Sequence, residues 1–333
     1  MMSLIRATSG RRLMGIPGRT SLACLTANRE PEAPVLQTQG MREAFGDNTL
    51  NMNRRMQCYS RMTYWLMPDL LARVLAIANR KGGTGKSTAV VNLGAELAVR
   101  GYRVLVVDLD PQGHAGLGFG ICSRPGDVTI HTALRERTSL VRGVRRTSEP
   151  KLDVLPADRD FDGVIRLQDP RCLAKALAPL RSSYDMVLID TPPGSANLIV
   201  CALLSADGVV VPTALEHLSL DGVRQFARSY HQVMVSLNAA LLGLMVLPMR
   251  VDLRSTVQKD VLDCLIRGFG LDQVVRGVRI DTAVSEAFGR NQPLRRYKAS
   301  ARAVADFAGV ADEVLRRFQC ADLHPDGLTA LAG

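Results

Sequence analysis

A glycine-rich loop with two lysines is the feature that most constrains the fold of this chain. Lys81–Thr88 reads Lys-Gly-Gly-Thr-Gly-Lys-Ser-Thr and follows a short apolar run over 71–79. Such runs are typical of buried parallel strands. The residues after the loop, up to Arg100, have helical periodicity. We therefore expect a strand, a tight loop and a helix, with the loop backbone N–H groups turned inward around phosphate oxygens.

The loop predicts a site for ATP and Mg²⁺. Lys86 is expected to reach the β- and γ-phosphates, and the Ser87 hydroxyl is expected to ligate Mg²⁺. The N-terminus of the following helix adds positive potential. The predicted ATP-binding residues are Gly82, Gly83, Thr84, Gly85, Lys86, Ser87 and Thr88. The alternative is a glycine turn without a ligand.

Two acidic segments follow predicted strands. Val107–Gly113 reads Val-Asp-Leu-Asp-Pro-Gln-Gly, and an apolar run over 185–190 ends in Asp190 and is followed by Thr-Pro-Pro-Gly. Ligands of open α/β sheets bind at the carboxyl ends of strands, so these acids are expected to face the phosphates. Asp190 is expected to bind Mg²⁺ through a water molecule, because Mg²⁺ keeps several waters and few protein ligands.

Strands alternate with helices along the rest of the chain. We expect further strands over 103–108, 152–156, 208–212 and 241–247, and helices over 171–181, 219–237, 255–268 and 299–318. This alternation predicts an α/β fold with a doubly wound, mostly parallel sheet and helices on both faces.

The folded domain is expected to span residues 71–318. Residues 1–66 have no sustained helical period, and we interpret them as an N-terminal extension that is disordered or follows a start codon placed too early. Their arginine-containing, acid-poor beginning leaves an organellar transit peptide as the alternative. Residues 321–333 are expected to form a loose tail. The sequence has no run of 18 or more apolar residues, so we expect no membrane-spanning helix.

The spacing of the two loop lysines identifies a family resemblance. The ordinary phosphate loop would have glycine at position 80, where this chain has Arg80, and here Lys81 precedes Lys86 by five residues. The segment resembles, without a mismatch, the deviant Walker A loop of the ParA/MinD family of P-loop ATPases. In that family the extra lysine reaches the nucleotide of a second subunit, so the resemblance implies an ATP-dependent homodimer. It also implies that Lys81, Lys86 and Asp110 are catalytic, with Asp110 orienting the attacking water.

Weaker matches extend the resemblance over about 71–318. The segments over 211–222, 247–254 and 278–287 are similar to later segments of the family. The resemblance implies that Arg254 contacts DNA. An arginine that the family usually has two residues before Ser-Glu-Ala is replaced by Ala283, so Arg279 and Arg290 are expected to substitute for it.

The charge of the chain agrees with an anionic partner. The chain has 42 Lys+Arg against 32 Asp+Glu, a formal net charge of +10, and nine of its basic residues lie between Arg250 and Arg296. Aromatic residues are not interleaved with them, so base stacking is not expected. Contact with duplex phosphates, independent of sequence, fits this pattern. The alternative is that these side chains form a solvated surface.

The resemblance implies a ParA-type partition ATPase that is cytoplasmic and associated with the nucleoid. It implies that the ATP-bound dimer binds duplex DNA non-specifically and that a ParB-like DNA-binding partner stimulates hydrolysis. A MinD-like or other protein-positioning ATPase is the first alternative, although the chain has no basic residue after Arg317 for a membrane-binding terminal helix. A P-loop synthetase acting on a small acid and a non-catalytic, nucleotide-dependent DNA-binding module are the others.

Overall fold

One eight-stranded sheet organises the part of the chain that the structure describes. The computed structural model describes residues 71–161 and 169–318; the expected extension over 1–66 and the tail over 321–333 lie outside these ranges. The strands are β1 (Arg73–Ile77), β2 (Val104–Asp108), β3 (Arg145–Arg146), β4 (Leu152–Leu155), β5 (Met186–Asp190), β6 (Gly208–Ala214), β7 (Leu244–Val251) and β8 (Val278–Arg279).

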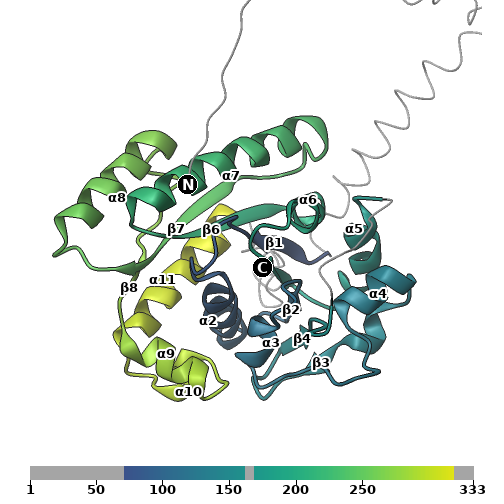
Figure 1. Ribbon diagram of the computed structural model, residues 1–333. Helices are drawn as coiled ribbons and strands as arrows, with labels where there is room; N and C mark the ends of the chain where they lie inside the picture. The colour runs from purple at the N-terminus through teal and green to yellow at the C-terminus, as the bar shows by residue number, and fades with distance from the viewer. Residues whose placement is uncertain (1–70, 162–168, 319–333) are drawn as a thin grey trace, which may run out of the picture. The chain divides into compact units, whose positions relative to one another are not determined.

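The strand order is β3-β4-β2-β5-β1-β6-β7-β8 (Figure 1). All neighbouring strands are parallel except β3 and β4, which are antiparallel. The central strand β1 has β5 on one side and β6 on the other. The predicted doubly wound, mostly parallel sheet is therefore confirmed.

Helices cover both faces of the sheet, and each face has its own apolar core (Figure 1). One face packs against α2 (Lys86–Val99), α3 (His114–Leu117), α9 (Thr282–Gly289), α10 (Leu294–Tyr297) and α11 (Arg302–Arg317). The other packs against α4 (Ile130–Glu136), α5 (Cys172–Leu177), α6 (Ala196–Ser205), α7 (His217–Ser236) and α8 (Thr256–Phe269). The described residues also form the short 3₁₀ helices η2 (Leu140–Gly143) and η3 (Ala178–Leu180).

Several elements differ from the sequence-based expectation, among them the following three. The helix expected over 171–181 becomes α5 followed by η3, since Pro179 has no N–H to continue the α-helical ladder. The strand expected over 241–247 begins at Leu244 and continues through Pro248 to Val251, paired with β6. Helix α6 was not predicted, because its largely apolar sequence has no strongly amphipathic pattern.

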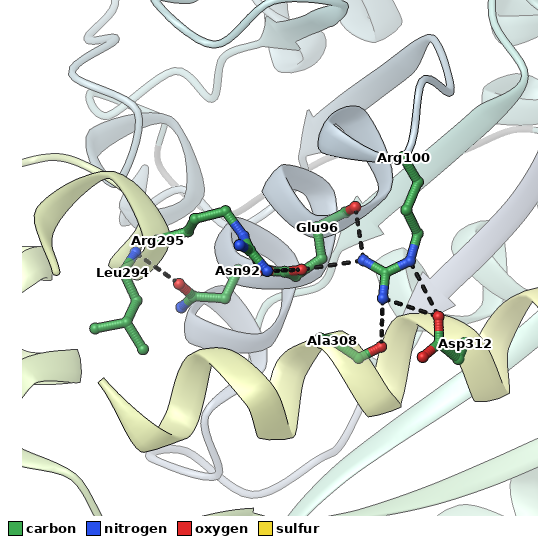
Figure 2. A network of polar contacts seen from close by, with 7 residues as sticks. All are labelled: Asn92, Glu96, Arg100, Leu294, Arg295, Ala308 and Asp312. Atoms are coloured by element: carbon green, nitrogen blue, oxygen red, sulfur yellow. Dashed lines mark hydrogen bonds and ion pairs between the residues drawn. The ribbon is translucent and has the colours of Figure 1, made fainter. Parts of the chain in front are cut away.

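A buried carboxylate joins α2 to α10 and α11 (Figure 2). Glu96 is 2% exposed, and its two oxygens accept hydrogen bonds from Nε and an Nη of Arg295, both at 2.7 Å. Arg100 donates to Glu96 at 3.0 Å and also contacts Asp312 on α11 at 2.8 Å. The backbone N–H of Leu294 donates to Asn92 Oδ1 at 2.9 Å. The helix that follows the glycine-rich loop is thus fixed to the C-terminal helices.

Candidate nucleotide-binding site

The glycine-rich loop lies between β1 and α2, at the carboxyl end of the central strand. Gly83 and Gly85 have φ values of 70° and 91°, in the left-handed region that favours glycine. A Cβ at Gly85 would also lie 3.1 Å from the Met249 side chain. Helix α2 starts at Lys86 without a side-chain cap, so its first N–H groups are free to bind an anion.

Lys86 lies among the predicted catalytic and metal-binding acids. Its side chain is almost fully buried, and its Nζ donates to the carbonyl oxygen of Lys81 at 3.2 Å. Burial lowers the pKa of Lys86, and the carboxylates of Asp190 and Asp110 act in the opposite direction. The fold therefore brings Lys86, Asp110 and Asp190 close to one another.

The two strand-end acids beside the loop are in register. Asp108 on β2 pairs with Asp190 on β5, and both are fully buried. Burial raises the pKa of Asp190 to about 7, and burial together with Asp190 raises the pKa of Asp108. One oxygen of Asp108 accepts the backbone N–H of Gly116 at 2.8 Å, which fixes the start of α3.

The surroundings of Asp190 fit a hydrated divalent cation. Neither carboxylate oxygen of Asp190 has a hydrogen-bond partner of good geometry within the described residues, although the Ser87 hydroxyl and the Thr191 backbone N–H lie close enough to lower its pKa against the effect of burial. Buried polar atoms without partners are rare in proteins, so these oxygens point to a missing partner. No group of three or more His, Cys, Asp or Glu side chains is placed to hold a metal ion in residues 71–161 and 169–318. A magnesium ion here would thus depend on water and phosphate oxygens for most of its ligands.

Asp110 belongs to a tight turn directly after β2. Its Oδ1 accepts the backbone N–H of Gln112 at 3.0 Å, and its carbonyl oxygen accepts the N–H of Gly113 at 2.9 Å. Asp110 is 6% exposed. The turn therefore fixes the side chain at the rim of the site, close enough to Lys86 to act on its pKa.

Lys81 does not extend away from its own subunit in this structure. Its Nζ donates to Glu216 at 3.1 Å and to Ser219 Oγ at 2.9 Å, at the beginning of α7. The ammonium group of Lys81 lowers the pKa of Glu216. Both side chains of the ion pair are partly exposed.

Arg250, which the sequence named only as one of the basic residues of a DNA-binding surface, also lies at this edge of the sheet. It lies between Met249 and Val251, where the register of β7 against β8 shifts, and its φ is 57°. Such bulges often redirect a side chain beside an active site. After Lys81, Arg250 also contributes to lowering the pKa of Glu216. The sequence gives no signal for a bulge at an arginine.

The three predicted DNA-contacting arginines are only partly brought together. Arg254 and Arg279 line one hollow of about 390 Å³, and Arg290 at the end of α9 does not line it. Arg254 forms an ion pair with Asp252 at 2.7 Å, and Arg279 forms one with Asp306 at 2.8 Å. These two cations are therefore partly neutralised within the chain.

Several of the basic residues between Arg250 and Arg296 already pair with carboxylates of the same chain, and Ala283 is buried. Ala283 is 3% exposed, and its backbone N–H donates to the Asp281 side chain at the start of α9. Arg295 pairs with buried Glu96 and Arg296 pairs with Glu149. Four of the nine basic residues between Arg250 and Arg296 thus have carboxylate partners.

The loop before α2 and the acids at the neighbouring strand ends define a P-loop nucleoside triphosphatase. A family model described as an AAA domain matches residues 72–242. The chromosome partitioning protein ParA of Caulobacter vibrioides is 36% identical over 260 residues, which cover 74% of this chain and 94% of that protein. The chain belongs to the ParA/MinD family of P-loop ATPases.

Two solved structures extend the comparison. The septum site-determining protein MinD of Pyrococcus horikoshii, complexed with Mg-ADP, has a TM-score of 0.61 at 27% identity, and the match covers 73% of this chain and 96% of that one. Cobyrinic acid a,c-diamide synthase of Mycobacterium smegmatis with bound ADP and magnesium has a TM-score of 0.63 at 31% identity and covers 75% and 96%. Across the described ranges, no helix combines the length and apolar character needed to span a membrane.

Proposed function

We propose that this protein is a ParA-type partition ATPase that hydrolyses ATP with Mg²⁺. The observation that supports this most is the convergence of Lys86, Asp110 and Asp190 at the glycine-rich loop, with Lys81 at its edge. The relation to ParA of Caulobacter vibrioides agrees with this assignment. The proposal places the protein in the cytoplasm, associated with the nucleoid.

Each residue of the site has a distinct task in the proposed reaction. The ammonium of Lys86 and the free N–H groups at the start of α2 bind the β- and γ-phosphates. Ser87 directly, and Asp190 through a water molecule, would hold a magnesium ion, which neutralises charge on the phosphate oxygens. Asp110 orients the attacking water, and the turn over 110–113 keeps its carboxylate in place.

The proposed dimer depends on Lys81. In the ATP-bound state Lys81 leaves Glu216 and Ser219 and contacts the phosphates of the ATP bound to the second subunit. The dimer then presents two copies of the surface around Arg254 and Arg279 to the phosphates of duplex DNA. A ParB-like partner stimulates hydrolysis, and the resulting ADP-bound subunits separate from each other and from DNA.

A synthetase that activates a small acid is the second candidate, because a cobyrinic acid a,c-diamide synthase shares the fold at 31% identity. Such an enzyme needs an acid acceptor for ATP turnover. A partition ATPase should instead respond to DNA and a DNA-binding partner. ATP turnover measured with duplex DNA, and separately with a panel of small carboxylic acids and glutamine, distinguishes the two.

Two variants test the proposed site. Asp110→Ala should retain ATP binding and form a stable ATP-dependent dimer without turnover, and Lys81→Ala should bind ATP but remain monomeric. Sedimentation velocity with ATP and ADP, together with phosphate release, measures both properties. Wild-type turnover in Asp110→Ala, or an ATP-dependent dimer of Lys81→Ala, would contradict the proposal.

A further inference from the structure

We propose that His131 is a positioning residue for the Asp110 turn and that it acts through the carbonyl group of Leu109. This inference rests on the proposed role of Asp110 in hydrolysis. His131 lies on α4, outside the motifs identified from the sequence, and it is fully buried.

The ring of His131 connects two segments that follow neighbouring strands. Its Nε2 is 3.2 Å from the carbonyl oxygen of Leu109, which lies between Asp108 and Asp110. Its Nδ1 accepts the backbone N–H of Asp158 at 3.0 Å, in the segment after β4. Because Asp158 is the donor, Nδ1 has no proton, so Nε2 must have the proton and donate to Leu109.

The peptide groups of Leu109 are held from two sides. The backbone N–H of Leu109 donates to the carbonyl oxygen of Asp190 on β5 at 2.9 Å, and its carbonyl oxygen accepts from His131 on α4. The backbone directly before Asp110 therefore has little freedom to rotate. Asp110 then continues into the turn that Gln112 and Gly113 close.

The segment after β4 also packs against α4 and against the turn that contains Asp110. The ring of Phe161 stacks on the ring of His131, with centroids 4.4 Å apart and an interplanar angle of 14°. The Arg159 side chain lies so close to Gly113 that a Cβ there would be 3.1 Å from its Cγ. The N–H of Ile130 also donates to the carbonyl oxygen of Pro156 at 3.0 Å. His131 thus lies where α4, the segment after β4 and the turn with Asp110 meet.

The two ring nitrogens of His131 should have different effects on ATP turnover. Loss of the Nε2 donor leaves a buried carbonyl next to Asp110 without its partner and frees the peptide that positions the carboxylate. Loss of the Nδ1 acceptor affects the Asp158 segment and leaves Leu109 bonded. Turnover should therefore depend on the Nε2 bond more than on the Nδ1 bond.

Two amide variants separate these bonds. In His131→Gln the amide nitrogen can replace Nε2, and in His131→Asn the amide oxygen can replace Nδ1. Both remove the stacked ring, so their losses of stability should be similar. We expect His131→Asn to lower kcat about tenfold without a matching change in KM. His131→Gln should keep most of the wild-type kcat. Phe161→Leu, which keeps both hydrogen bonds, should lower the melting temperature and leave kcat within about twofold.

The reference for this experiment is Asp110→Ala, measured in parallel for ATP binding and phosphate release. Loss of turnover in Asp110→Ala with equal kcat values for His131→Asn and His131→Gln would overturn the inference and leave the proposed function intact. Full turnover in Asp110→Ala would overturn the proposed function itself. A kcat for Phe161→Leu as low as that of His131→Asn would show that packing, and not the Leu109 bond, supports the turn.

Discussion

Lys81 forms an ion pair with Glu216 of the same chain, with Nζ and Oε2 3.1 Å apart. Ser219 Oγ accepts a second hydrogen bond from the same ammonium group at 2.9 Å. These contacts stabilise the lysine in the single subunit. A lysine that must reach a second subunit therefore has to break them first.

Replacing Glu216 should favour the proposed dimer. In Glu216→Gln the ion pair is lost, and because both side chains are partly exposed, its contribution is below about 1 kcal/mol. We expect the dissociation constant of the ATP-bound dimer to fall about two- to fivefold, measured by sedimentation in the Asp110→Ala background. Weaker dimerisation would mean that Glu216 is itself needed in the dimer.

Lys86→Ala should abolish ATP binding, because the β- and γ-phosphates lose their buried cation. A titration with a fluorescent ATP analogue measures the affinity. Lys175→Ala is the matched control, since Lys175 is an exposed lysine paired with Asp169 on the opposite face of the sheet. Unchanged affinity in Lys86→Ala would refute the phosphate-binding role of the loop.

Glu96→Ala should destabilise the protein by about 3 kcal/mol, because it leaves Arg295 and Arg100 without their buried partner. Asp312→Ala removes the other carboxylate of Arg100 (Figure 2), but this group is 68% exposed. Its loss should cost less than about 1 kcal/mol. Urea unfolding of the two variants gives the comparison, and equal losses would show that burial of Glu96 does not set its contribution.

Acidification should destabilise the fold through His131. Burial lowers the pKa of His131 to about 4, with smaller opposing effects from the Leu109 carbonyl and Asp158 and a small lowering from Arg135. The folded pKa lies below the unfolded value of about 6.5, so the unfolded chain binds more protons between these pH values. The free energy of unfolding should therefore fall as the pH drops through this window, by about 2 kcal/mol from about pH 7 to pH 5.

The variant His131→Gln isolates this effect from other groups that titrate in acid. Urea unfolding at about pH 7 and pH 5 should show the wild-type protein losing about 2 kcal/mol more than the variant. Equal losses in the two proteins would contradict a buried neutral His131.

Local pattern was sufficient to predict the sheet, the glycine-rich loop and the acids at the ends of β2 and β5. These features depend on apolar runs and on residue types whose spacing has a direct chemical meaning. His131, by contrast, has its partners at Leu109 and Asp158, which are distant in sequence. The bulge at Arg250 likewise depends on pairing between β7 and β8. Such contacts form only when separate segments meet, so local patterns gave no sign of them.

The ion pairs of the basic residues also could not be predicted without the structure. The sequence shows the charges of Arg254 and Arg279 but not the carboxylates of Asp252 and Asp306 that pair with them. In the proposed DNA complex, phosphate oxygens would have to replace these two carboxylates. The DNA affinity of the protein therefore depends on ion pairs that the sequence alone does not show.

The most direct test of the account is fluorescence anisotropy of random duplex DNA titrated with the Asp110→Ala protein in ATP and in ADP over a salt series. With about six to eight phosphate contacts per dimer, the logarithm of affinity should fall against that of salt concentration with a slope of about −5 to −7. We expect this binding with ATP and not with ADP. Arg254→Ala should have a lower affinity for every DNA sequence and a smaller salt slope. Equal affinity in both nucleotides, or no binding in either, would contradict the account.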